Sequence, residues 1–372
     1  MTGVQRMGLN LLLAVDALLA RDPPPQRWVL LCPAGADVPK LSFIEAVVSD
    51  IHLPPHFWQQ IVLPWKARNG LLMSLGGSAP WLLRNQICTM HDAAVFDRPD
   101  AYTFAFRTWY RGLFAHLARE SRAVLTVSRF SADRLVHHLP KLGGRLAVVP
   151  NGADHLASVV PDPDALTRWA LVKNRYLLAV GCQNRLKNLH RLFAAAQQVQ
   201  APGIVLVVVG GSHSRVFTSD AVPEGESMPI VPTGTIDDAA LKALYENALG
   251  LVFPSSYEGF GLPPVEAMSC GCPVVATTAG AVPDVCGDAV LYFDPLDVGS
   301  MVAQMQRLID DAPLRESLRQ RGFARAQELS WQGSARVLMA ELAQRGFLFP
   351  PVQDDCREDP AAHAGADASG AN

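Results

Sequence analysis

Residues 254–268 read PSSYEGFGLPPVEAM and follow the apolar run 251–253. The apolar run predicts a short buried strand, and the glycines predict a turn. Pro263 and Pro264 suit the first turn of a helix, where backbone N–H groups have no helical partner. A strand that leads through a glycine turn into a helix is typical of α/β proteins with parallel sheets. We therefore expect one strand-turn-helix unit of such a fold here.

The same alternation extends along most of the chain. Strands are predicted at 28–31, 86–90, 123–127, 146–149, 176–180, 204–209, 251–253 and 273–276. Helices are predicted between them, among others at 102–120, 188–200 and 237–248. This alternation predicts doubly wound parallel sheets with helices on both faces.

The length of 372 residues suggests two domains, because domains commonly hold about 100–200 residues. The turn at 150–152 and the weak periodicity after it predict a linker at 154–174. We therefore expect a first domain at 1–153 and a second at 175–349. Residues 350–372 are rich in Ala, Gly and Asp and predict a disordered tail.

The two halves of the chain carry opposite net charge. Residues 1–150 contain 16 Lys and Arg against 10 Asp and Glu, whereas residues 151–372 contain 16 against 25. The total of −3 argues against a nucleic-acid partner. The basic first half suggests contact with an anionic surface or substrate.

Seven scattered cysteines match neither a disulfide framework nor a zinc motif, so we expect reduced thiols in a cytoplasmic protein. The sequence contains no run of about 18 apolar residues, so no membrane span is predicted. Residues 9–20 have the apolar character of a signal peptide, but Asp16 interrupts the run and no cleavage site follows. We expect an amphipathic first helix there.

Glu258 and Glu266 stand at the two ends of the glycine turn, with seven residues between them. The backbone N–H groups of Phe260, Gly261 and Leu262, together with the helix N-terminus, predict an anion pocket. An isolated carboxylate in the first helical turn would only complement the helix dipole. The composition of the whole turn favours a ligand site instead.

The segment from Glu258 to Glu266 resembles the E-x7-E signature of retaining nucleotide-sugar glycosyltransferases of the GT-B fold, and it is most similar to glycosyltransferase family 4. The resemblance extends from the start of the chain to the helix after Trp331 and is strongest over 176–294. It implies two Rossmann-like domains that face a cleft. It also implies that Glu258 contacts the donor sugar or lies near the reacting carbon, and that Glu266 holds the ribose hydroxyls.

The loop at 181–188 carries Arg185 and Lys187 between a predicted strand and a helix, so its cations can reach a diphosphate at the helix N-terminus. The family usually has adjacent Arg-Lys-Asn after a proline here. Lys187 and Asn188 match that pattern, whereas Leu186 occupies the Arg position and Arg185 the Pro position. The alternative is a solvated loop pair without a ligand.

His91 follows the strand at 86–90, and ligands of open parallel sheets bind beyond the carboxyl ends of the strands. The resemblance implies that His91 contacts the donor sugar and organises the acceptor side, while the alternative is a hydrogen-bonded structural histidine. Thr235 is expected to line the nucleotide base, although a turn capped by Asp237 explains it equally well. The segment 128–131 is expected to cap a helix.

The stretch 2–6, with Gly3, resembles the family's glycine loop, which approaches the donor phosphate and follows the first strand of the sheet. That strand is missing here, because the chain starts at Met1. Our hypothesis is that the sequence begins downstream of its true start, or has lost it. A central strand supplied from elsewhere in the chain would contradict this hypothesis.

These features predict a hexosyltransferase that moves a sugar from a nucleotide diphosphate sugar with retention at the anomeric carbon. The resemblance leans towards mannose and a GDP-sugar. Lys187, Arg185 and the turn amides would stabilise the leaving diphosphate in place of a metal ion. The single D-x-D, at 162–164, is predicted to be a turn, so we expect no metal and no other cofactor.

Segment 98–145 holds nine basic and three acidic residues, and aromatic residues crowd its front. It predicts a peripheral contact with the inner face of the plasma membrane, unless the aromatics simply pack on the sheet. A glycan or lipid-linked sugar is then the expected acceptor, in surface polysaccharide synthesis.

Two rival functions stay open from the sequence, a truncated and inactive GT-B protein and a sugar-nucleotide epimerase. A nicotinamide dehydrogenase is disfavoured, because no G-x-G-x-x-G follows a predicted strand.

Overall fold

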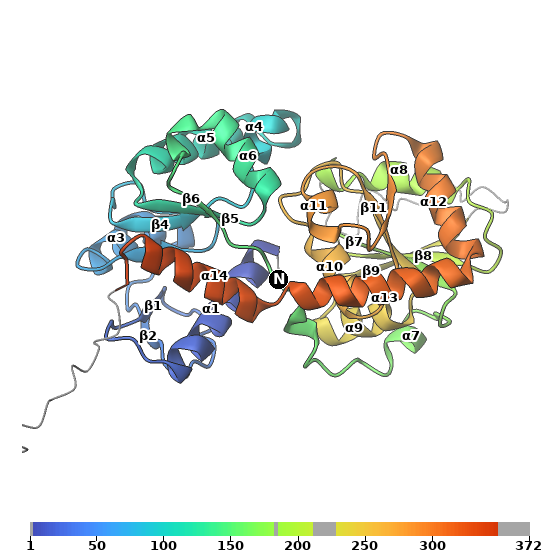
Figure 1. The fold of residues 1–372 in the computed structure, drawn as a ribbon, viewed down its shortest axis with the longest axis horizontal. Coiled ribbons are helices and arrows are strands. Elements are labelled where there is room, and N and C mark those ends of the chain that lie inside the picture. Colours follow the sequence, from blue (N-terminus) through green and yellow to red (C-terminus); the bar gives the residue numbers. More distant parts are fainter. Residues whose placement is uncertain (1–2, 182–184, 211–227, 349–372) are drawn as a thin grey trace, which may run out of the picture.

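A computed structural model describes residues 3–181, 185–210 and 228–348 (Figure 1). These residues form three sheets, of two, four and six strands, and every recorded strand pair is parallel. The α/β class expected from the alternating pattern is confirmed.

The four-stranded sheet lies in the first half of the chain. Its strands, in spatial order, are β3 (Leu72–Ser74), β4 (Gln86–Thr89), β5 (Ala123–Thr126) and β6 (Leu146–Val148). β4 and β5 are buried along their whole length, because helices cover both faces of the sheet. One face packs against α5 (Phe104–Glu120) and α6 (Arg129–His138), and the other against α1 (Gly3–Arg21) and α14 (Trp331–Gln344) (Figure 1).

A separate pair of strands, β1 (Val29–Cys32) and β2 (Glu45–Val48), lies beside this sheet (Figure 1). Within the described residues β1 pairs only with β2, and β3 pairs only with β4. No described strand therefore takes the central place in the sheet that the missing first strand would occupy. The hypothesis about the start of the chain stays a prediction.

The six-stranded sheet lies in the second half. Its spatial order is β12 (Leu291–Phe293), β11 (Val274–Thr277), β10 (Gly250–Phe253), β7 (Tyr176–Val180), β8 (Val205–Val209) and β9 (Ile230–Gly234). Side chains alternate along each strand, so one set packs beneath α8 (Leu189–Ala196) and α12 (Val298–Asp310). The other set packs on α9 (Asp238–Asn247) and α10 (Leu262–Ser269). α13 (Ala312–Glu328) lies against α10, and its Leu318 joins the first set.

Shorter helical elements complete the described chain. They are α2 (Pro55–Phe57), η1 (Trp58–Val62), α3 (Leu63–Lys66), α4 (Ala94–Asp97), η2 (Pro99–Ala101), η3 (Pro140–Leu142), η4 (Asp154–Leu156), α7 (Ala165–Arg168), η5 (Arg185–Lys187) and α11 (Val282–Cys286). α7 packs against α9, so part of the expected linker lies on the second sheet's side of the molecule.

The chain passes between its two halves twice, once after β6 and once between α13 and α14. The two passages touch: the N–H of Ala153 donates to the carbonyl of Leu329 at 2.8 Å. Gly152 lies so close to the second passage that an added Cβ would stand 2.3 Å from the backbone nitrogen of Trp331. After this point α14 lies along α1, beneath the first sheet (Figure 1).

α1 is, among the described helices, the one long and apolar enough to cross a membrane by length and composition. In this fold it packs on α14, and its side chains Met7, Leu11 and Leu19 are buried in the core. Asp16, the residue that interrupts its apolar run, is also buried. Its carboxylate accepts the backbone N–H groups of Ser42 (2.7 Å), Phe43 (2.9 Å) and Ile44 (2.8 Å).

Asp16→Ala should lower the free energy of unfolding by about 3 kcal/mol, because it leaves three N–H groups without their acceptor. Burial raises the pKa of Asp16, but the three N–H donors outweigh it and the net shift is downward. The stabilisation is therefore present above the unfolded-state value of about 3.9 and is lost as the pH falls through the folded-state pKa.

Urea titrations at neutral and acidic pH would measure both effects. Asp22→Ala, at an exposed carboxylate just beyond α1, is the matched control and should change little. An Asp16→Ala protein as stable as the wild type at neutral pH would contradict this account.

Candidate active site

The glycine turn between β10 and α10 contacts the first half of the molecule through its backbone. The carbonyl of Gly259 accepts the hydroxyls of Ser128 (2.6 Å) and Ser131 (3.1 Å). A Cβ added at Gly259 would stand 2.6 Å from the carbonyl oxygen of His91 and 2.9 Å from Cβ of Asp92. Glycine is therefore needed for this close approach. Ser128 also caps α6 as expected, since it accepts the N–H of Ser131.

Lys187 and Glu258 meet in this region as an ion pair. Nζ of Lys187 lies 2.6 Å from Oε1 of Glu258, and both side chains are largely shielded from solvent. Two further contacts fix the lysine: its stem lies against Gly181, and its ammonium stands 5.6 Å from the ring centre of Phe253. Two residues predicted to act on the donor, 71 positions apart in sequence, are thus brought together.

His91 and Asp92 follow β4 and lie on the first-domain side of the same region. Nε2 of His91 lies 3.1 Å from the carbonyl of Leu75, which assigns the ring proton to this nitrogen. Burial lowers the pKa of His91, so the ring is neutral near pH 7. Burial also raises the pKa of Asp92 to about 6, with Glu258 adding to the rise. The N–H of Ala94, at 2.8 Å, and the charge of Lys187 act against it.

The predicted anion pocket lies at the start of α10. Gly261 has a φ of +92°, which favours glycine, and it precedes Leu262, the first residue of the helix. Within the described part of the chain, the N–H groups of Gly261 and Leu262 donate to no acceptor. Gly3 lies against this helix end, because a Cβ added to it would stand 3.7 Å from Cδ1 of Leu262. The ring of Phe260 is buried beside them.

Glu266 is buried in a cluster where the two halves meet. Its Oε1 accepts Nε2 of His155 (3.1 Å) and lies 3.5 Å from Nε of Arg6, and its Oε2 accepts the hydroxyl of Tyr245 (3.1 Å). Nδ1 of His155 accepts the indole N–H of Trp331 (3.2 Å), so Nε2 carries the proton. Burial and the nearby carboxylate raise the pKa of Tyr245 well above its usual range.

Arg6 extends this cluster across the two halves. Its guanidinium holds both carboxylate oxygens of Asp238 on α9, at 2.9 and 2.6 Å. Arg6, Asp238, Tyr245 and His155 were not among the predicted site residues. The sequence signal that could have identified Arg6 was its position three residues after Gly3 in the predicted glycine loop.

A second missed cluster centres on Asp97 at the end of α4. Its carboxylate binds Arg134, with Nε at 2.9 Å, accepts Nε2 of His138 at 2.7 Å, and accepts the hydroxyl of Tyr257 from the glycine turn at 2.8 Å. Burial raises the pKa of Asp97, but these hydrogen bonds outweigh it and hold the pKa well below its usual range. The glycine turn therefore rests on the first half at a charged contact as well as at Gly259.

The other predicted residues lie at the edge of this region. Arg185 is exposed, and its Nη1 stands 3.5 Å from the carbonyl of Asp100. Thr235 is exposed directly after β9, where Asp237 caps α9 as the alternative predicted. Residues 182–184, which belong to the basic loop, lie outside the described residues.

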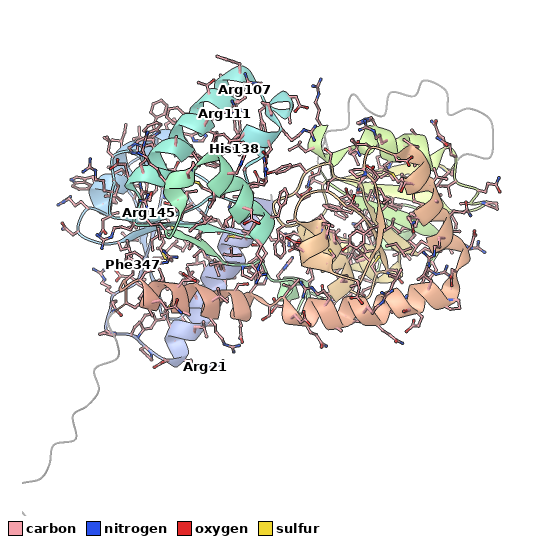
Figure 2. The ribbon with its side chains drawn as sticks, turned by 45° about the horizontal axis from the view of Figure 1, so that its top comes forward. Arg21, Arg107, Arg111, His138, Arg145 and Phe347 are labelled. Atoms are coloured by element: carbon pink, nitrogen blue, oxygen red, sulfur yellow. The ribbon has the colours of Figure 1, made fainter. Side chains whose placement is uncertain are left out.

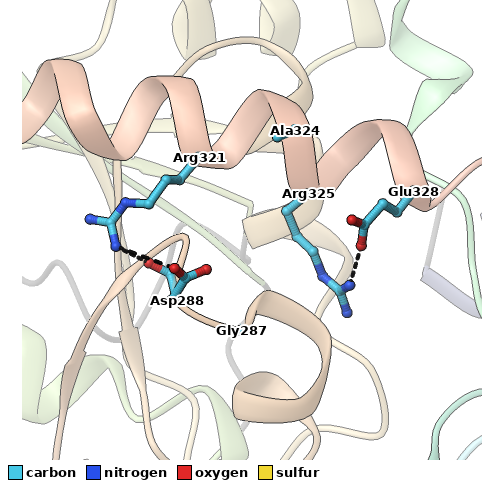
Figure 3. Close-up of a pocket in the computed structure, with 6 residues that line it drawn as sticks. All are labelled: Gly287, Asp288, Arg321, Ala324, Arg325 and Glu328. Atoms are coloured by element: carbon cyan, nitrogen blue, oxygen red, sulfur yellow. Dashed lines mark hydrogen bonds and ion pairs between the residues drawn. The ribbon is translucent and has the colours of Figure 1, made fainter.

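Among the described residues, no group of three His, Cys, Asp or Glu could hold a metal ion. The described cysteines are free thiols. A pocket of about 310 Å³ lies elsewhere, between the loop at Gly287 and α13 (Figure 3). Arg321 and Arg325 line it, but each contacts an acidic side chain there, Asp288 and Glu328 respectively.

Comparison with known proteins places the chain in a family. A family model described as glycosyltransferase family 4 matches residues 32–155, and one described as glycosyl transferases group 1 matches residues 168–325. The O-antigen chain mannosyltransferase B of Escherichia coli is 30% identical over 269 residues, covering 68% of each chain. The chain belongs to glycosyltransferase family 4. This membership supports a hexosyltransferase of polysaccharide synthesis, and neither rival function is favoured.

Solved structures agree on the architecture. WaaG, a glycosyltransferase involved in lipopolysaccharide biosynthesis, matches this family 4 chain with a TM-score of 0.68 at 16% identity, over 91% of this chain and 96% of its own. HepE of Anabaena, solved with UDP-glucose, matches with a TM-score of 0.56 at 19% identity, over 70% and 72%. The predicted GT-B fold is thereby confirmed.

Gly259→Ala should separate the two halves of this glycosyltransferase, because the new methyl group would collide with backbone at His91. A displacement of about 1 Å in the site is enough to slow turnover about a hundredfold. Small-angle scattering should show a larger radius of gyration. Gly70→Ala, which has open space at its Cβ, is the matched control. Unchanged scattering together with unchanged turnover would contradict the assigned contact.

Proposed function

We propose that this protein transfers a hexose, mannose in particular, from a nucleotide diphosphate sugar to a glycan or lipid-linked acceptor, with retention at the anomeric carbon. The observation that carries the proposal is the Lys187–Glu258 ion pair, next to the contact of Gly259 with His91 and Asp92. The mannosyl relative in Escherichia coli supports the choice of sugar.

The diphosphate is assigned to the start of α10. The N–H groups of Gly261 and Leu262 and the helix dipole offer hydrogen bonds and positive potential. Lys187 adds a full charge, and Arg185 stands at the outer edge of the same loop. These groups act where the leaving diphosphate gains negative charge, which is the largest catalytic contribution in many enzymes. The proposal needs no divalent metal.

The ribose is assigned to Glu266. An ionised carboxylate offers about four acceptor positions. His155, Arg6 and Tyr245 approach three of them, so one position stays available for a ribose hydroxyl. Because Arg6 and His155 already hold the carboxylate in place, little ordering would be needed when the nucleotide binds.

The sugar is assigned to the neighbourhood of Glu258 and His91. Glu258 would accept hydrogen bonds from the sugar hydroxyls. The neutral ring of His91 would lie beside those hydroxyls. In the transfer, the bond from the anomeric carbon to the donor phosphate oxygen breaks and its electron pair stays on the diphosphate. The acceptor oxygen bonds to the same face of that carbon, and its proton passes to the leaving phosphate.

The acceptor side is assigned to the first domain, with a peripheral contact at the inner face of the plasma membrane through 98–145. On α5, Phe104, Phe106 and Trp109 are exposed, whereas Tyr110 and Phe114 pack inward. Figure 2 shows Arg107 and Arg111 along the same helix. The guanidinium of Arg111 is engaged by the carbonyls of Val95 and Phe96, so the aromatic side chains supply most of this surface.

Glu266→Gln should weaken nucleotide binding at least about tenfold, the cost of one hydrogen bond to a charged group. Calorimetric titration with GDP, UDP, dTDP and ADP measures this loss and names the base. Glu316→Gln, at an exposed carboxylate on α13, is the control. A Glu266→Gln protein that keeps its melting temperature and binds the nucleotide as tightly as wild type would refute the ribose assignment.

Turnover of GDP-mannose with a lipid-linked glycan should continue when EDTA removes divalent ions. NMR of the product should show the α-anomer. Lys187→Ala should lower kcat about a hundredfold or more, because it removes the cation at the leaving group. Lys173→Ala, at an exposed lysine, serves as the control. Dependence on a divalent ion or an inverted product would overturn the metal-free, retaining mechanism.

A further inference from the structure

The helical segment 55–66 carries a stripe of large apolar side chains on its outer side. Phe57, Ile61 and Trp65 repeat every four residues and are 60%, 60% and 58% exposed. The inner side of the same segment is also apolar and packs Trp58 and Val62 on the first sheet. Among the described residues, none buries the three side chains of this outer stripe.

The sequence around the stripe is basic. Residues 51–91 contain Lys66, Arg68 and Arg84 and neither Asp nor Glu, and Arg84 pairs with Glu120 at the end of α5, with Nε at 3.1 Å. The guanidinium of Arg68 stands 5.0 Å from the ring centre of Trp65 and also donates to its carbonyl. A tryptophan paired with a cation suits a water–lipid interface, where the ring enters the headgroup layer and the charge meets phosphate.

The stripe continues towards α5. Side-chain amides of Gln59 and Gln60 hold the loop at 78–81 through the carbonyls of Ser78 and Ala79. In that loop the ring of Trp81 lies 5.8 Å from the ring of Trp109 on α5. The next residue, Leu82, is 88% exposed. The outer side of 55–66 and the exposed aromatics of α5 therefore flank one loop.

We propose that segment 55–66 inserts into the headgroup region of an anionic bilayer, with Phe57, Ile61 and Trp65 on the acyl side and Lys66 and Arg68 at the lipid phosphates. A helical segment that exposes aromatic and aliphatic side chains on its outer side, with Lys66 and Arg68 beside them, has the composition of interfacial segments. A second copy of the chain is a poor occupant, because two such surfaces would bring like charges together.

This inference deepens the proposed membrane contact by naming a different element, and it does not depend on the assigned donor site. Figure 1 places α3 at the end of the first domain that is remote from α12 and the second sheet. Docking through this end leaves the glycine turn and its partners away from the lipid.

Flotation of the full chain with vesicles tests the proposal. Binding should be strong on phosphatidylcholine containing about one third phosphatidylglycerol, weak on phosphatidylcholine alone, and reduced by salt. The triple variant F57S/I61S/W65S should bind at least about tenfold more weakly. The matched control V160S/V172S/L296S removes three exposed apolar side chains elsewhere and should bind like the wild type.

Three results would overturn it. One is undiminished vesicle binding by F57S/I61S/W65S. Another is loss of binding only in variants of α5, such as F104S/F106S/W109S. The third is a wild type that dimerises through the stripe by light scattering and ignores vesicles. Nucleotide titration of F57S/I61S/W65S should match the wild type, so a failure of this proposal is distinct from a failure of the donor site.

Discussion

The close approach of the backbone at Gly259 to the first half of the molecule is the contact on which the site depends. Without a side chain there, the turn reaches the hydroxyls of Ser128 and Ser131. The approach places Glu258, from the second sheet, beside His91, from the first. Two independent sheets thus contribute to one site because a single residue has no Cβ, and Tyr257 steadies the contact through its hydroxyl.

Three carboxylates that are largely shielded from solvent have different hydrogen-bond partners, and the partners indicate which carboxylates are structural. Asp16 is satisfied by backbone N–H groups and ties a helix to a loop. Asp97 is satisfied by cationic and hydroxyl side chains. Asp92 accepts a single backbone N–H and has its pKa raised to about 6. A carboxyl group whose pKa lies this close to neutral pH is typical of functional sites.

Strands buried on both faces were predictable, since β7 has the predicted bounds 176–180. Four strands were missed: β2, β3, β9 and β12. β2 and β9 are partly exposed and contain Glu45 and Pro232, which disfavour strand prediction, and β3 and β12 are only three residues long. Residues beside strand ends or glycine turns, such as Glu258, could be proposed from the local pattern and the family resemblance, and their roles stay predictions. The Arg6–Asp238 pair could not be, because it joins residues 232 apart.

The double passage between the halves has a consequence for synthesis. Because α14 completes the core around α1, the second sheet with its helices is an insertion within the first domain. The ends of that insertion are held together by the Ala153–Leu329 hydrogen bond. On the ribosome, the inserted unit can fold as soon as its last helix emerges. The domain that begins the chain must wait for residues near its end before its own core closes.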